Sequence, residues 1–259
     1  MKPTRREMRN FNGLRNIVAM LRGPEGCPWD RVQTHESLRP YLMEEASEAL
    51  AALDEGDSAR LCEELGDLLL EVLLHVQIAE EMGEFELVDV IESISDKLVR
   101  RHPHVFGEAV ADTPEAVVDQ WDELKREERG GQSALTGIPP TLPALAYAQA
   151  TQRRADKAGF RYEFVDQVWQ ALEEELAELR EARTPDEQRA EVGDVLASVV
   201  NLARWLDIDA EDALRSTSRT FGRRFRQLEE IVATRGADLR EMTLEEKLAL
   251  WEEAKARPG

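Results

Sequence analysis

Cysteine is scarce in this chain, and long uncharged apolar runs are missing. The 259 residues include two cysteines, Cys27 and Cys62, which excludes a disulfide framework and is typical of a reducing cytoplasm. The basic segment MKPTRREMRN lacks the apolar run of a signal peptide. No stretch approaches the roughly 18 apolar residues of a membrane span. We therefore expect a cytoplasmic protein with no membrane partner.

Positive charge is also in deficit. Asp and Glu number 53 against 33 Lys and Arg, which gives a formal net charge of −20. A surface this negative repels phosphate backbones and anionic lipid, so we expect no nucleic acid partner. Such a chain can instead collect divalent cations wherever several carboxylates converge.

Strand-like alternation is absent, and the hydrophobic period is helical throughout. The Gly- and Pro-rich stretch 129–143 interrupts this period and is interpreted as a linker. The sequence therefore predicts an all-α protein whose domains, 1–128 and 144–259, are similar to each other. The expected helices cover about 8–21, 38–53, 59–82 and 87–100, then 142–154, 166–182, 185–206 and 210–233, with a short last helix after Thr243.

Local signals mark where several of these helices begin. Asp57 or Ser58 is the predicted N-cap of the helix that starts near residue 59. Thr184 and Thr243 each precede a Glu by three residues, which is the pattern of a capping box.

A similar group of carboxylates occurs once in each half, where Glu-Glu-x-x-Glu is followed by Glu-x-x-Asp. At about 100° per residue, the second Glu of the first motif falls within the apolar arc of its helix in both halves. The next helices are apolar nearly all round, so we expect these carboxylates to face protein instead of bulk water. The first set is Glu45, Glu48, Glu64 and Asp67, and the second set is Glu175, Glu178, Glu191 and Asp194.

Four inward-facing carboxylates require positive charge nearby. Two anions about 5 Å apart repel by about 3 kcal/mol at an effective dielectric constant near 20. No Lys or Arg within the spacing of either set would neutralise four charges. Because Mg²⁺ prefers oxygen ligands, each set predicts a Mg²⁺ site, with Mn²⁺ as a substitute. Structural pairing with distant arginines is the alternative.

Two further polar residues extend the stripe of the first set. Glu71 and His75 follow Asp67 at helical spacing, but their counterparts in the second half are Ser198 and Leu202. We therefore expect neither residue to be a metal ligand. We interpret His75 as a core histidine whose ring nitrogens have hydrogen-bond partners.

A cationic patch and then a tryptophan follow each carboxylate set. Basic residues suit a helix C-terminus for structural reasons, but a repeated basic pair can also clamp phosphate oxygens. The tryptophans can stack on a base or simply pack. These residues are Lys97, Arg100, Arg101 and Trp121 in the first half, and Arg219, Thr220, Arg223, Arg224 and Trp251 in the second.

Several segments of both halves carry a family resemblance. They are GCPWD, YLMEEASE, LCEELGDLL and SDKLVRRHPHVF in the first half, and VWQALEEELAELR, EVGDVLASVVNLARWL and FGRRFRQLE in the second. Together they resemble the MazG family of all-α nucleoside triphosphate pyrophosphohydrolases. The resemblance implies two tandem helical-bundle domains, each completed by formation of a homodimer. It also implies Mg²⁺-dependent hydrolysis of nucleoside triphosphates to a monophosphate and pyrophosphate, in a role that removes unwanted nucleotides or responds to stress.

The resemblance also assigns residues. It implies metal ligands at both carboxylate sets and nucleotide contacts in the segments ending at Glu175 and before Glu191, at Thr220 to Arg224 and at Trp251. A Lys often found in the family at the position of Thr220 is missing, whereas Lys97 keeps it in the first half. Further candidate substrate contacts are Glu174, Arg189 and Asp194.

The expected mechanism is attack of a water on the α-phosphorus. Glu44 or Glu174, beside the first ligand of each set, is the candidate that orients or deprotonates this water. A di-iron oxidoreductase would need paired Glu-x-x-His motifs, which the two sets lack. A non-catalytic helical interaction protein with structural carboxylate sites remains the alternative.

Overall fold

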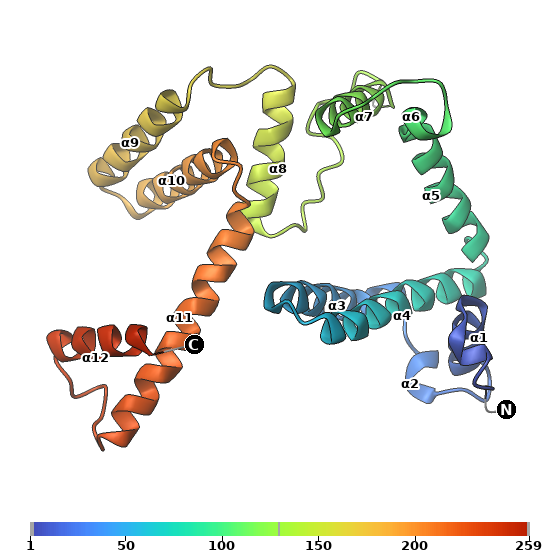
Figure 1. The fold of residues 1–259 in the computed structure, drawn as a ribbon, viewed down its shortest axis with the longest axis horizontal. Coiled ribbons are helices and arrows are strands. Elements are labelled where there is room, and N and C mark those ends of the chain that lie inside the picture. The colour runs from blue at the N-terminus through green and yellow to red at the C-terminus, as the bar shows by residue number, and fades with distance from the viewer. Residues whose placement is uncertain (1–2, 129, 258–259) are drawn as a thin grey trace. The chain divides into compact units, whose positions relative to one another are not determined.

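The computed structural model describes residues 3–128 and 130–257. It is built of helices and turns, with no strand in these two ranges, which confirms the all-α prediction (Figure 1). The chain divides into two compact units, Met1–Leu124 and Lys125–Gly259. The boundary falls inside a helix that ends just before the predicted linker, whose first residue, Arg129, lies outside the described residues, as do 1–2 and 258–259. The domain limits inferred from the sequence stay a prediction.

Most helices begin and end close to where the sequence places them. No helix in the described part of the chain combines the length and the apolarity that crossing a membrane requires. The first unit contains a 3-10 turn at Glu7–Arg9 and helices α1 (Phe11–Arg22), α2 (Pro28–Arg31), α3 (His35–Glu55), α4 (Ser58–Met82), α5 (Leu87–Arg101) and α6 (Pro103–Phe106), and helix α7 (Pro114–Glu128) crosses the boundary between the units. The second contains α8 (Ala144–Lys157), α9 (Val165–Glu181), α10 (Pro185–Trp205), α11 (Ala210–Thr234) and α12 (Leu244–Ala256).

The sequence analysis does not predict three of the helices. Helices α2 and α6 are single turns that open on a proline, in segments whose Gly and Pro content indicates a break. Helix α7 has few apolar residues, although Val117, Trp121 and Leu124 recur at helical spacing and could have indicated it.

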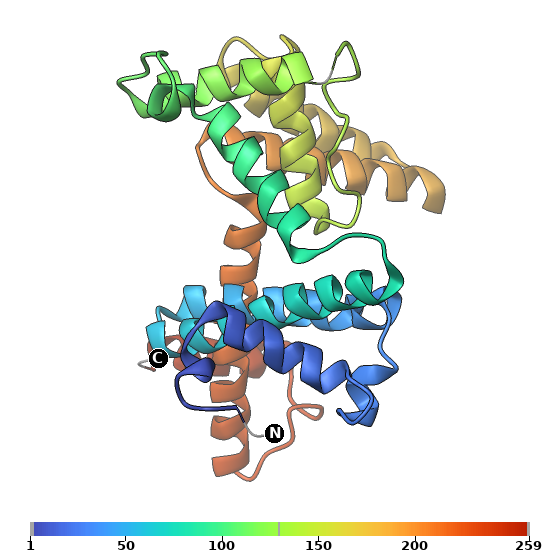
Figure 2. The same cartoon turned by 90° about the vertical axis from the view of Figure 1, so that its right-hand side faces the viewer.

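An antiparallel helix hairpin forms the centre of the first unit. Gly56, in the left-handed conformation with φ of 68°, ends α3. Asp57 then caps α4 by accepting hydrogen bonds from the backbone N–H groups of Ala59 and Arg60. Of the two candidates for this N-cap, Asp57 and Ser58, the structure therefore shows Asp57. Both ribbon views show α3 and α4 running side by side (Figures 1 and 2).

The second unit repeats this hairpin with α9 and α10. The predicted capping box opens α10, since the backbone N–H of Glu187 donates to Thr184 Oγ1 and that of Thr184 donates to the Glu187 carboxylate. Helix α8 packs against α10 and α11, and α12 packs against α11. A second capping box, at Thr243 and Glu246, opens α12 as predicted.

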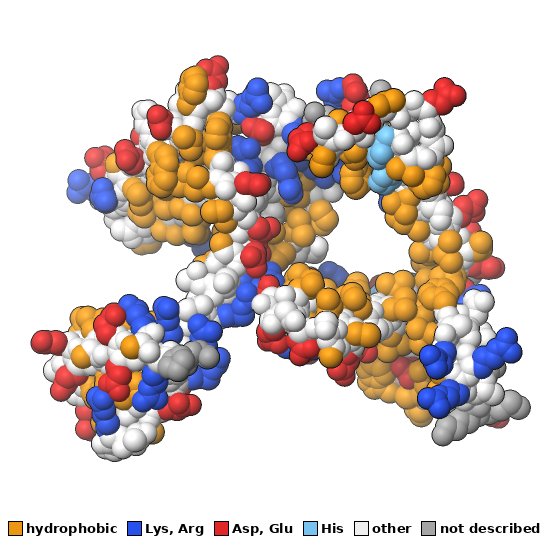
Figure 3. Space-filling model, in the orientation of Figure 1, with side chains coloured by type: hydrophobic (Ala, Val, Ile, Leu, Met, Phe, Trp, Pro, Cys, Tyr) orange, Lys and Arg blue, Asp and Glu red, His pale blue; other side chains and the backbone are white. Residues whose placement is uncertain are grey.

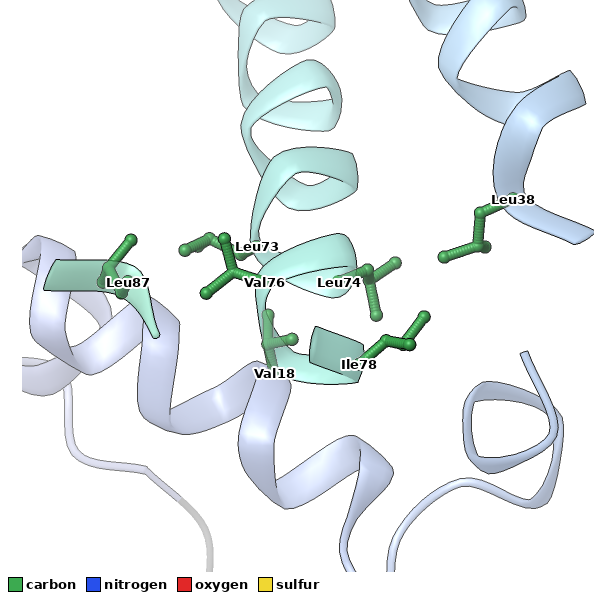
Figure 4. Close-up of a cluster of buried hydrophobic side chains, with 7 residues drawn as sticks. All are labelled: Val18, Leu38, Leu73, Leu74, Val76, Ile78 and Leu87. Carbon is green, nitrogen blue, oxygen red and sulfur yellow. The ribbon is translucent and has the colours of Figure 1, made fainter. Parts of the chain in front are cut away.

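The core of the first unit surrounds the second half of α4 (Figure 4). Ion pairs between Arg15 and Glu80 and between Arg22 and Glu81 tie α1 to the same end of α4. This packing leaves the first half of α4 free to present its carboxylates towards α3. The buried cluster consists of Leu73, Leu74, Val76 and Ile78 of α4, with Val18 of α1, Leu38 of α3 and Leu87 of α5.

A matched apolar stripe on α4 and α10 is exposed in the single chain. Its residues are spaced by four and three, as on one face of a helix. Hydrophobic side chains gather on the surface over both hairpins (Figure 3). The sequence predicts that the carboxylates of these two helices face protein, but in the described part of the chain the apolar side chains beside them are exposed. The stripe is Leu65, Leu69 and Val72 on α4, and Val192, Leu196 and Val199 on α10.

Candidate metal and nucleotide site

Each helix hairpin brings three carboxylates together. Two come from one turn of the first helix and the third from the facing helix, so the hairpin turn decides their register. In each group one oxygen from every residue lies within 4.8 Å of the others, close enough to hold a metal ion. The groups are Glu45, Glu48 and Glu64 on α3 and α4, and Glu175, Glu178 and Glu191 on α9 and α10.

The fourth predicted ligand of each set lies at the edge of its group. Asp67 and Asp194 are outside the 4.8 Å clusters, yet their charges act on them. Burial, followed by the charge of Asp67, raises the pKa of Glu45 above its ordinary value. Burial and the charge of Asp194 raise the pKa of Glu175 in the same way. The two sites thus share one electrostatic pattern.

The degree of burial differs from the sequence-based expectation. Only Glu64 is fully buried, whereas Glu48, Glu178 and Asp194 are exposed, and the other members are intermediate. These carboxylates stay partly exposed because the described residues leave the neighbouring apolar stripe uncovered.

Cationic compensation also differs between the two sites. Arg60 Nε donates to Glu64 Oε1 at 3.2 Å, and its Nη1 donates to Glu55 at 2.8 Å. The sequence analysis missed this partner, although the four-residue spacing from Arg60 to Glu64 is a standard signal for a helical ion pair. In the second site, Glu187 takes the place of Arg60.

The second site passes a simple test for a hard cation. Glu191 Oε2 is buried and has no hydrogen-bond partner among the described residues. It belongs to a group of three carboxylates, so the available donors are all oxygen atoms. Oxygen donors of this kind suit Mg²⁺ and Mn²⁺, and a buried anionic oxygen without a partner is costly until a cation approaches it.

Comparison with known proteins agrees with this geometry. Residues 33–106 match the MazG nucleotide pyrophosphohydrolase domain, a range that includes the first carboxylate set. Over 247 residues, the chain is 46% identical to the nucleoside triphosphate pyrophosphohydrolase/pyrophosphatase MazG of Thermotoga maritima, with 95% of each chain covered.

The chain belongs to the MazG family. This MazG chain is also 41% identical over 257 residues to the nucleoside triphosphate pyrophosphohydrolase of Escherichia coli, covering 96% of this chain and 98% of that protein. It is 45% identical over 251 residues to the uncharacterised protein YabN of Bacillus subtilis, of which it spans 51%.

The candidate water-activating residues of this MazG chain lie on the solvent side of the ligands. Glu44 and Glu174 are both exposed, and Glu174 accepts a hydrogen bond from Gln170 at 2.8 Å. Arg189, also exposed, lies on α10 two residues before Glu191. Their predicted roles in catalysis and nucleotide binding remain predictions.

The basic and aromatic candidates of the second unit lie on α11 and α12, whereas its carboxylates lie on α9 and α10. Arg223 and Arg224 lie on α11 about 20 Å along the helix from its start. Trp251 of α12 packs on the ring of Phe221, with 5.1 Å between ring centroids, and contributes to the apolar cluster between α11 and α12. Arg219 and Thr220 lie on α11 one turn before Arg223 and Arg224.

The corresponding candidates of the first unit lie on α5 and α7. Arg100 and Arg101 end α5, one turn after Lys97. Lys97 lines a shallow hollow whose other lining residues also lie on α5 or just before it. The ring of Trp121 lies 5.7 Å from that of His102. Their contacts with nucleotide remain predictions.

His75 and Glu71, which the sequence analysis excluded as ligands, each have a buried polar atom without a partner among the described residues. His75 stacks on His35, with 2.7 Å between their Nδ1 atoms, but its buried Nε2 has no partner in the described structure, so it is not a satisfied histidine. Glu71 is buried, and its Oε2 also lacks a partner. Only the folded structure shows these unpartnered atoms, because the spacing of residues along the sequence does not tell which buried groups lack a hydrogen-bond partner.

Proposed function

We propose that this MazG protein hydrolyses nucleoside triphosphates to a nucleoside monophosphate and pyrophosphate, and that Mg²⁺ held by the two carboxylate sets supports the reaction. The observation that carries the proposal is the convergence of three carboxylates on each hairpin. The names of the relatives from Thermotoga maritima and Escherichia coli support the substrate class. Removal of excess or aberrant nucleotides is the role that fits this chemistry.

The chain contributes ligands, a base and anion-binding groups. Mg²⁺, when bound, neutralises triphosphate charge and makes a water more acidic. Glu44 or Glu174 orients this water and accepts its proton as the oxygen attacks the α-phosphorus. The bond from the α-phosphorus to the bridging oxygen breaks, and pyrophosphate leaves with the bonding electrons.

Basic residues stabilise the leaving pyrophosphate. Guanidinium groups suit this task because they bind phosphate oxygens through paired hydrogen bonds. The proposed set is Lys97, Arg100 and Arg101 for the first site, and Thr220, Arg223 and Arg224 for the second, with Arg189, Trp121 and Trp251 as further nucleotide contacts.

We also propose that the protein is a homodimer in which a second chain completes each helical bundle. Two observations support this arrangement. The second-unit basic residues lie far along α11 from the α10 junction, and the same apolar stripe is exposed on α4 and α10. Docking of a second chain would cover the stripe and bring new side chains to the carboxylates.

The decisive experiment measures pyrophosphate release from a panel of nucleoside triphosphates. Glu45→Gln and Glu175→Gln each remove one ligand charge at constant size, so each should abolish turnover by its own unit. The rate of pyrophosphate release by the double variant should be at least about a hundredfold below that of the wild type. EDTA should lower the wild-type rate to the same extent.

Glu229→Gln, at an exposed position of α11, is the matched control and should keep wild-type turnover. A double variant with wild-type turnover would exclude the proposal. A wild-type protein that binds Mg²⁺ without turnover of any nucleotide would favour the non-catalytic alternative.

A further inference from the structure

The first unit carries one carboxylate more than the second on the same helix face. Glu71 follows Glu64 by seven residues, so the two lie within about 20° of each other and about 10 Å apart along the axis of α4. Asp67 lies between them. In the second unit, Ser198 occupies the position that corresponds to Glu71.

The antiparallel hairpin sets the order of the carboxylates that face each other. Moving along α4 from Glu64 towards Glu71 corresponds to moving back along α3 from Glu48 towards Glu45. The electrostatic effects follow this order, since Asp67 is the charge that acts most strongly on Glu45. Glu71 therefore belongs at the Glu45 end of the site, away from Glu48.

Glu71 is in a state that requires a partner. Glu71 is only 7% exposed, and its Oε2 atom is buried without a hydrogen-bond partner among the described residues. Burial, and then the charge of Glu45, raise its pKa above the ordinary value. Arg60, the cation that pairs with Glu64, lies almost two turns before Asp67 on α4, at the opposite end of the site.

A cation explains this arrangement. A buried carboxylate oxygen without a partner costs free energy, and a nearby second carboxylate increases that cost. A divalent ion between them would satisfy both, as oxygen-rich sites do for Mg²⁺ and Mn²⁺. A serine in place of the glutamate supplies no charge, so the second unit has no such need.

We propose, on the basis of the metal sites argued above, that Glu71 is a fifth carboxylate ligand of the first unit. Together with Glu45 and Asp67, it holds a divalent cation additional to the one held by Glu45, Glu48 and Glu64. The second unit lacks this additional ion because Ser198 replaces the ligand. The two halves of the protein consequently differ in the number of cations that they bind.

The test counts Mn²⁺ bound to the full-length, nucleotide-free protein, from the paramagnetic resonance signal of free Mn²⁺ during titration. Glu71→Gln, which keeps the size and removes the charge, should bind one Mn²⁺ fewer per chain than the wild type. Ser198→Ala is the matched control and should bind the wild-type number. An unchanged number and affinity in Glu71→Gln would overturn the proposal and would show that a proton, instead of a metal ion, neutralises Glu71.

A reciprocal variant keeps the test decisive if Glu71→Gln does not fold. Ser198→Glu should add one Mn²⁺ per chain to a folded protein, and no gain would contradict the proposal. Wild-type protein that binds no Mn²⁺ would overturn both this inference and the proposed function. Loss of pyrophosphate release with the expected Mn²⁺ counts would overturn the proposed function alone.

Discussion

At the scale of single residues, one arginine makes the two carboxylate sets unequal. Arg60 donates to Glu64 and so competes with a metal ion for one of its ligands. Glu187, its counterpart, is used instead by the backbone at the start of α10, whose N–H groups lower its pKa. Within the described residues, the second set therefore lacks a counterpart of the arginine that pairs with Glu64 in the first set.

Replacing Arg60 tests this competition. Arg60→Ala should strengthen Mn²⁺ binding to the first unit by about two- to fivefold, because it removes a solvent-screened ion pair from Glu64. Isothermal titration with Mn²⁺ measures the change. Arg39→Ala, which removes an exposed arginine of α3, controls for net charge. Equal effects of the two variants would show that the specific contact is unimportant.

The raised pKa values of Glu45 and Glu175 predict a pH dependence of the metal-free protein. Because these pKa values lie above the ordinary value of 4.5, each of these two carboxyl groups binds more proton in the folded than in the unfolded chain just above pH 4.5. The contribution of these groups to stability is therefore largest at low pH and declines as pH rises through the folded pKa.

Melting temperatures in EDTA between pH 4.5 and neutrality measure this dependence. The Glu45→Gln, Glu175→Gln double variant should show a smaller decline than the wild type, because it lacks both titrating groups. Glu229→Gln should retain the full decline. A double variant with an unchanged pH profile would assign the effect to other residues.

At the scale of elements, helix ends determine whether ligands on facing helices meet. Asp57 and Thr184 start α4 and α10 within about two turns of Glu64 and Glu191. A shift of either start by one residue would rotate the following carboxylates by about 100° away from their partners. The caps are thus part of the site, although they touch no ligand.

Loss of one cap should be measurable as lost stability. Thr184→Ala removes the oxygen that accepts the backbone N–H of Glu187, and should lower the free energy of unfolding of the second unit by about 1 kcal/mol. Urea unfolding followed by circular dichroism measures it. Thr217→Ala, at an exposed mid-helix position of α11, should cause no loss. Equal midpoints for both variants would contradict the role of the cap.

At the scale of the whole molecule, the same exposed apolar stripe recurs on both units. Leu69 and Leu196 occupy its centre on α4 and α10, each five residues after the ligand Glu64 or Glu191. Because both side chains are already at least half-buried, removing the rest of their surface from water yields about 1 kcal/mol each. A second chain that covers the stripe would gain this free energy and shield the neighbouring carboxylates.

A charge in the stripe should therefore weaken the dimer. Leu196→Asp should raise the dimer dissociation constant by at least about tenfold, because it places an anion at the proposed interface. Sedimentation velocity over a range of concentrations measures it. Val110→Asp, at a highly exposed position outside the stripe, should leave the dimer intact. Wild-type protein that sediments as a monomer would exclude the proposed assembly.

The sequence by itself determined most of the longer helices and the phase of their carboxylates. Periodicity and capping act within one or two turns, so Thr184 or the spacing of Glu45 and Glu48 can be interpreted without a fold. The pair of Arg60 and Glu64 is equally local and could have been found.

Only the tertiary structure decided how distant residues meet. The contact of His35 with His75 joins positions 40 residues apart, and the burial of Glu71 without a partner depends on what α3 places opposite it. The packing of Trp251 on Phe221 likewise depends on how α12 folds back on α11. Such features depend on how helices pack, which local periodicity does not encode.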